Sequence, residues 1–190
     1  MTATQAFRRD QRAVRARALR DLLDIWPAFD PDDPDAYLAG ARAVVARGHE
    51  TAAALAGGYV RAVGREQGLR AVPVTLAVLS EQQAATSLRI TSVIRYRAAL
   101  GAGVGPQAAR QAALVQQLGA ASRLILGGGR QTVVQSVRTA GARWQRVTSG
   151  NACDFCTLLA GRGAVYAEET SDFAAHDHCG CSAEPIYRQR

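Results

Sequence analysis

The chain has 190 residues, 48% of them hydrophobic, and a formal net charge of +7 to which arginine contributes every one of the 23 basic residues. This length is enough for a real hydrophobic core, which excludes a miniprotein that needs disulfides because of its size. The charged N-terminal stretch lacks the apolar region of a secretory signal, and no run approaches the roughly 18 apolar residues of a membrane span; we expect a soluble, cytosolic, non-membrane protein whose thiols bind metal or do chemistry.

The first two predicted helices are separated by the turn "FDPDDPDA". The first is amphipathic, rich in arginine, and ends near Trp26-Pro27. In the turn, Asp33 is suited to cap the second helix and Pro34 to occupy its first position. The second helix is expected to end at Gly64 or Gly68, and its apolar and small residues recur at alternating three- and four-residue steps: Leu38, Ala41, Val45, Gly48, Ala52, Leu55, Tyr59 and Ala62. Such a seam lets another helix approach closely, from this chain or from a second copy.

Two further helices are predicted downstream. One runs from about Leu79 to Leu100, with Ile90, Val93 and Ile94 facing inward, and "GAGVGP" interrupts it. The next begins at Pro106, and we interpret the glycine run at 127–129 as its end. Neither glycine run fits a dinucleotide or phosphate-loop motif, because no strand precedes it and no "GK[ST]" follows.

The character of the sequence changes near Gly141. A short strand is predicted around Trp144–Val147, followed by turn residues and short apolar runs. The expected fold is therefore mainly α, with a body of long, close-packed helices over 1–140 and a small β-rich module over 141–190. Low aromatic content and many Ala, Val and Leu residues favour close-packed helices as well.

All cysteines lie in the C-terminal module. Cys153 and Cys156 form C-x-x-C, and "HDHCGC" follows about twenty residues later with His176, Cys179 and Cys181. A module this small has almost no core, and a structural Zn²⁺ held by four nitrogen or sulfur ligands supplies the missing folding free energy. We expect Phe155, Leu158 and Leu159 to pack behind the metal.

Two ligand sets fit this spacing. One is the four cysteines; the other is three cysteines and His176, which then replaces Cys179 or Cys181. His178 is a weaker candidate, because neighbours along a strand point to opposite faces. Two disulfides are the alternative to a metal. A thioredoxin-like redox motif is not expected, because the sequence around C-x-x-C lacks a βαβ pattern.

We expect that the protein is not an enzyme. A catalytic zinc keeps one coordination position open and usually has a carboxylate base nearby. The acidic residues around the cluster, which are Glu168, Glu169, Asp172 and Asp177, lack the H-x-E arrangement of zinc deaminases and read as solvated surface. His49, on the second helix, reads as an ordinary surface or interface histidine.

The C-terminal motif resembles the signature of phage minor head proteins of the Mu F-like head-morphogenesis family. The resemblance covers about the last forty residues and runs through "ACDFCTLLAG" and "HDHCGCSAEP", with matches at Cys153, Cys156, Leu159, Gly161, His176, Cys179, Cys181 and Pro185. Gly180 departs from the family, which usually has Arg between the last two cysteines. The chain is also shorter than many members, with no room for a fused protease or toxin domain.

This resemblance implies a structural minor capsid protein of a tailed phage. Such a protein is made in the host cytoplasm and built into the virion, inside the head near the portal vertex. Its implied partners are the portal protein, further copies of itself around the portal, and packaged DNA. The positive charge agrees with weak, non-specific contact with DNA. The alternative hypothesis, from a different functional class, is a zinc-dependent nucleic-acid-binding protein or nuclease.

Overall fold

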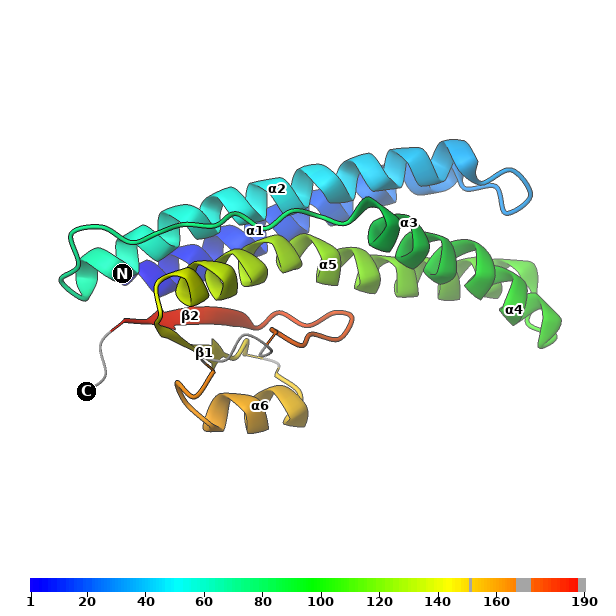
Figure 1. Ribbon diagram of the computed structural model, residues 1–190. Helices are drawn as coiled ribbons and strands as arrows, with labels where there is room; N and C mark the ends of the chain where they lie inside the picture. The colour runs from blue at the N-terminus through cyan, green and yellow to red at the C-terminus, as the bar shows by residue number, and fades with distance from the viewer. Residues whose placement is uncertain (151, 167–171, 188–190) are drawn as a thin grey trace.

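The computed structural model describes residues 1–150, 152–166 and 172–187, and it confirms a mainly α fold with a small sheet near the C-terminus. Three long helices pack side by side: α1 (Ala3–Ile25), α2 (Asp35–Glu66) and α5 (Pro106–Thr139) (Figure 1). A 3₁₀ turn, η1 (Trp26–Ala28), follows α1. Within the described residues, no helix is long and apolar enough to cross a bilayer.

The start of each long helix follows local sequence signals. Thr2 caps α1 in a capping box with Gln5, and Pro106 occupies the first turn of α5. The predicted N-cap of α2, Asp33, was wrong by one position. Pro34 is itself the N-cap and no side chain caps the helix, so Asp33 does not play that role.

The small-residue seam of α2 faces the other helices of the same chain. A Cβ added at Gly48 would lie 3.0 Å from Cγ1 of Ile125 in α5 and 3.5 Å from Cβ of Ala18 in α1. Ala41, Val45 and Ala52 are fully buried there. Of the two expectations for the seam, close packing within the chain is the one that the structure shows.

The glycine run at 127–129 does not end a helix, so that expectation was wrong. α5 continues through it to Thr139, and the run lies where α5 crosses its neighbours. A Cβ at Gly128 would lie 2.2 Å from the carbonyl oxygen of His49 in α2, and one at Gly129 would lie 2.7 Å from Nε2 of Gln11 in α1. The missing side chains permit this close approach of backbones, and the remaining residues of α5 are sufficient to keep it helical.

The helix expected over 79–100 is divided into three parts. These are α3 (Glu81–Arg89), a π-helical turn, η2 (Ile90–Ile94), and α4 (Arg95–Gly101). The wider π turn changes which side chains face inward. Val93 is buried as expected, but Ile90 and Ile94 are about half exposed, which corrects their assignment to the core.

An extended segment connects α2 to α3 and lies along the helices (Figure 1). The backbone N–H groups of Thr75 and Ala77 donate to the hydroxyls of Ser136 and Thr132 in α5, at 3.0 and 2.9 Å. These bonds anchor a chain that belongs to no sheet.

The C-terminal segment packs beneath the last turns of α5. β1 (Arg143–Val147) pairs antiparallel with β2 (Ser182–Ile186), with Trp144 opposite Pro185, and α6 (Asp154–Gly161) lies between them in sequence. The strand predicted around Trp144–Val147 is thereby confirmed. Trp144 is buried and stacks on Tyr166, with ring centroids 4.4 Å apart.

One hydrophobic cluster joins helices and C-terminal segment. It contains Phe7, Tyr59 and Val137 from the helices together with Trp144, Phe173 and the three buried cysteines. The proposed division at residue 140 remains an expectation, and the left-handed Gly141 (φ 61°) marks the turn where α5 ends.

Candidate metal centre

The N-terminus of α6 positions the first cysteine pair. Cys153 is the N-cap of this helix, and its Sγ accepts a hydrogen bond from the backbone N–H of Cys156 at 3.5 Å. This bond lowers the pKa of the Cys153 thiol, because it favours the thiolate. C-x-x-C therefore places both sulfurs at the same end of a short helix.

The loop before β2 brings the second group to this end of α6. His176 Nε2 lies 3.0 Å from Cys153 Sγ and 3.9 Å from Cys156 Sγ. Cys156 Sγ lies 3.7 Å from Cys179 Sγ. His176 Nδ1 is 2.7 Å from the carbonyl oxygen of Asp177, which fixes the ring and leaves Nε2 directed at the sulfurs.

The five predicted ligands form two groups that share Cys156. One consists of Cys153, Cys156 and His176, the other of Cys156, Cys179 and Cys181, and within each group the ligand atoms lie within 4.8 Å of one another. The Sγ–Sγ separation of 3.7 Å between Cys156 and Cys179 matches the edge of about 3.8 Å expected for a tetrahedron with Zn–S bonds of about 2.3 Å. The two ligand sets derived from the sequence both include residues from each group.

The three buried thiols differ in their pKa values. The hydrogen bond with Cys181, and burial, raise the pKa of Cys179, whereas the hydrogen bond from Cys179 lowers the pKa of Cys181 to about 4. Burial raises the pKa of Cys156. Cys156 and Cys179 therefore keep their protons in the absence of a cation, and a metal ion bound here would have to displace them.

Two buried arginines surround the cluster, and the sequence analysis missed both. Arg130 of α5 is 3% exposed and donates from Nε and Nη2 to the carbonyl oxygens of Cys181 and Cys179, at 2.9 and 2.6 Å. Arg146 of β1 is 4% exposed, and its Nη1 lies 3.6 Å from Cys156 Sγ. Their charge would offset the negative charge that a divalent metal ion with three or four thiolate ligands retains.

A sequence signal existed for only one of these arginines. In the strand sequence "RWQRV", Arg146 is two residues from the buried Trp144 and therefore shares its inward face. The guanidinium of Arg146 lies 3.8 Å above the ring of Phe173, and its Nη2 donates to Ala174 at 2.6 Å. Nothing in the pattern around Arg130 indicates that it reaches the C-terminal loop.

Other sequence expectations at the site turn out differently. Phe155 and Leu158 are 50% and 63% exposed, so they do not pack behind the cluster. Their place is taken by Phe173 and Trp144, because α6 contributes only one of its faces, that of Cys156, to the core. The described structure places His49 in the α2–α5 contact, with Nδ1 2.9 Å from the carbonyl oxygen of Leu124.

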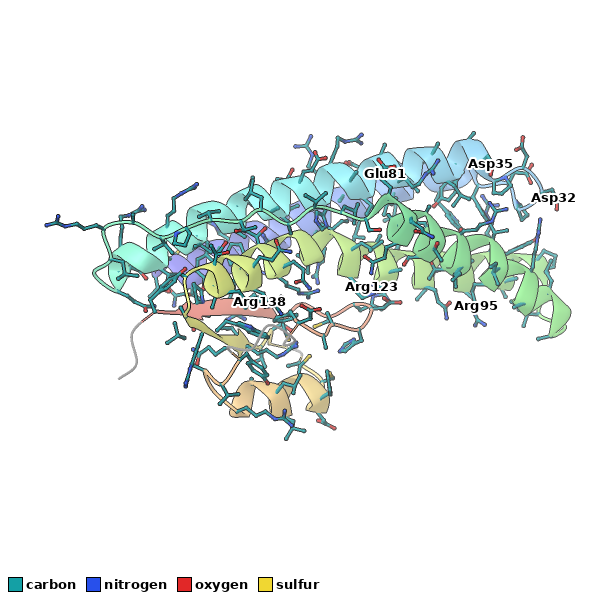
Figure 2. The ribbon with its side chains drawn as sticks, in the orientation of Figure 1. Asp32, Asp35, Glu81, Arg95, Arg123 and Arg138 are labelled. Atoms are coloured by element: carbon teal, nitrogen blue, oxygen red, sulfur yellow. The ribbon has the colours of Figure 1, made fainter. Side chains whose placement is uncertain are left out.

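The side chains of His178, Asp172 and Asp177 contact α5. His178 adopts a left-handed conformation (φ 62°), and its ring lies against Gly119 of α5. Asp172 and Asp177 form ion pairs with Arg138 and Arg123 at 3.1 and 2.8 Å, and Figure 2 labels both arginines on α5. Glu168 and Glu169 lie outside the described residues.

Comparison with known proteins gives one match. The family described as VG15 protein matches residues 1–190, the whole chain. No curated protein and no solved structure matches. The chain therefore belongs to the VG15 protein family, a family of viral genes.

Proposed function

We propose that this protein is a structural minor head protein of a tailed phage, related to the Mu F-like head-morphogenesis family. It is built into the procapsid at the portal vertex, in several copies, and stays inside the head beside the packaged DNA. A structural Zn²⁺ holds its C-terminal segment. Membership of a viral family and the C-x-x-C…H-x-x-C-x-C motif support this proposal.

The observation that carries the proposal is the convergence of all five candidate ligands at one end of α6. The cluster ties α6, whose buried residue is Cys156, to the loop before β2. A metal there adds its binding free energy to folding, which is the role of a structural site.

The surroundings of the cluster support a structural rather than a catalytic role. Among the described residues, Asp172 and Asp177 are held in ion pairs by Arg138 and Arg123, and Asp154, which follows Cys153, is exposed on the first turn of α6. The charged side chains that contact the ligand residues are Arg130, at the carbonyl oxygens of Cys179 and Cys181, and Arg146, at Cys156 Sγ; arginines are poor general bases because they stay protonated. We therefore propose that the protein is not an enzyme.

The exposed apolar side of α6 is suited to partner binding. Phe155, Leu158 and Val165 are each at least half exposed on the C-terminal segment. If this segment docks on the portal, these side chains supply apolar area to the contact. The metal then serves to hold them in place.

Co-expression with the portal protein encoded in the same genome, followed by size-exclusion chromatography, tests this function. We expect co-elution with the portal ring, and loss of co-elution for the double variant F155S/L158S. The matched control is Val78→Ser, because Val78 is 90% exposed on the helical body. A monomer that ignores the portal and cleaves DNA or RNA with added Zn²⁺, Mg²⁺ or Mn²⁺ would establish the nuclease alternative instead.

A further inference from the structure

A basic cavity lies between α1 and the cysteine loop. Its volume is about 320 Å³, and its lining includes Arg8, Arg12 and Arg15 of α1, Arg130 of α5, and His178 and Ser182 of the C-terminal segment. No acidic residue is among the described residues that line it. The three arginines of α1 therefore concentrate positive charge that no carboxylate in the lining compensates, which favours an anion.

The three arginines from α1 reach the cavity because of helical periodicity. They are spaced by four and three residues, which places them on one face of the helix. Arg8 is anchored there, because its Nη2 donates to the carbonyl oxygen of Thr148 at 2.6 Å. Arg15 Nη1 lies 3.5 Å from the position of a Cβ at Gly180, so the glycine leaves room beside this guanidinium.

Two buried polar side chains in the lining have hydrogen-bonding atoms without a partner among the described residues. Arg130 is 3% exposed; its Nε and Nη2 bind carbonyl oxygens, but Nη1 has no partner. Ser182 is 8% exposed, and its hydroxyl has no partner either. Both atoms are covered in the structure, so Arg130 and Ser182 contribute charge and polarity to the lining rather than direct contacts to a bound anion.

We infer that this cavity binds a phosphate group, which Arg12 and Arg15 hold, with Arg130 adding positive charge to the lining. Several guanidinium forks suit the oxygens of a phosphate better than the two of a carboxylate. The cavity has room for roughly ten water molecules, which is more than a lone phosphate needs, so a nucleotide unit of a nucleic acid fits the space. The inference rests on the proposed function only in naming packaged DNA as the natural source of the phosphate.

The test compares two double variants that remove the same charge from the same helix. R12Q/R15Q changes the cavity, whereas R17Q/R20Q changes two exposed arginines of α1 outside its lining. Glutamine keeps the helix propensity close to that of arginine. Circular dichroism and thermal melting confirm that both variants fold. Binding of a fluorescein-labelled 12-nucleotide oligo-dT is measured by anisotropy at 100 mM NaCl, and inorganic phosphate and hexaglutamate serve as competitors.

We expect R12Q/R15Q to weaken oligonucleotide binding tenfold or more and R17Q/R20Q to weaken it less than threefold, with inorganic phosphate competing. If inorganic phosphate alone binds, with the same dependence on Arg12 and Arg15, the phosphate site holds and its source is free phosphate. Equal loss in the two variants, absence of binding to either phosphate probe, or equally tight competition by hexaglutamate would overturn the inference. The assay uses this chain alone, so its result is independent of portal docking.

Discussion

Replacing Gly128 with alanine tests the close packing of α5 on α2. The added Cβ would lie 2.2 Å from the carbonyl oxygen of His49, which is more than 1 Å inside ordinary contact distance. The obstacle is a backbone atom in the middle of α2, so no side-chain rotation relieves it and the two helices must separate. Overpacking of this kind costs about 1–3 kcal/mol, and at a backbone obstacle we expect the upper end.

The gain in helix propensity opposes this cost. Alanine is favoured over glycine inside a helix by about 1 kcal/mol. The net destabilisation is therefore about 2 kcal/mol, which lowers the melting temperature by roughly 4–8 °C for a chain of this size. Gly127→Ala is the matched control, because a Cβ there meets nothing within 4 Å. It keeps only the propensity gain and should raise the melting temperature by roughly 2–4 °C.

Thermal unfolding monitored by circular dichroism at 222 nm distinguishes the two variants. Opposite signs are expected because position 128 faces α2 and position 127 does not. Equal shifts in the same direction would refute the packing argument and would favour the simpler view in which the glycine run acts only through backbone flexibility.

Three further outcomes are expected. Gly48→Leu should destabilise the chain by about 1–3 kcal/mol in urea unfolding, because the new side chain meets Ile125. Gly58→Leu is the control, because a Cβ at Gly58 has nothing within 4 Å. Equal destabilisation by the two variants would contradict the packing of the seam within the chain. Cys153→Ser should expose the buried Arg146 to trypsin while most helical signal remains, and the exposed Leu158→Ser should not; unchanged protection in Cys153→Ser would contradict a metal-held segment. Oligonucleotide affinity should fall steeply between 50 and 200 mM salt and depend little on sequence, since arginine–phosphate contacts release counterions without reading bases; sequence-dependent affinity would contradict this.

The sequence was informative where one local signal determines one structural feature. Pro106 and Gly103, in the predicted break "GAGVGP", mark helix ends, and the C-x-x-C spacing predicts two sulfurs at one site. Cysteines 23 residues or more further along are brought to the same site by the fold, and only their residue type indicated this.

The errors arose where packing overrides a local signal. The glycines at 127–129 were interpreted as the end of a helix because helix propensity alone does not include the packing free energy that a close helix crossing contributes. Ile90 and Ile94 were predicted to be buried because the 3.6-residue period of an α-helix was assumed over a segment that forms a π-helical turn. Arg130 was missed because a lone arginine in a helix carries no mark of the carbonyl groups that it binds 49 and 51 residues away.

Whether a metal ion holds the C-terminal segment is tested most directly by native mass spectrometry, combined with elemental analysis, of protein purified without chelator. We expect one zinc ion per chain, bound through Cys153, Cys156 and two of the ligands His176, Cys179 and Cys181. Cys156→Ser should abolish binding, because Cys156 belongs to both ligand groups, whereas His178→Ala should leave one zinc per chain. A chain free of metal, with its four cysteines either as free thiols or paired in two disulfides, would contradict the account.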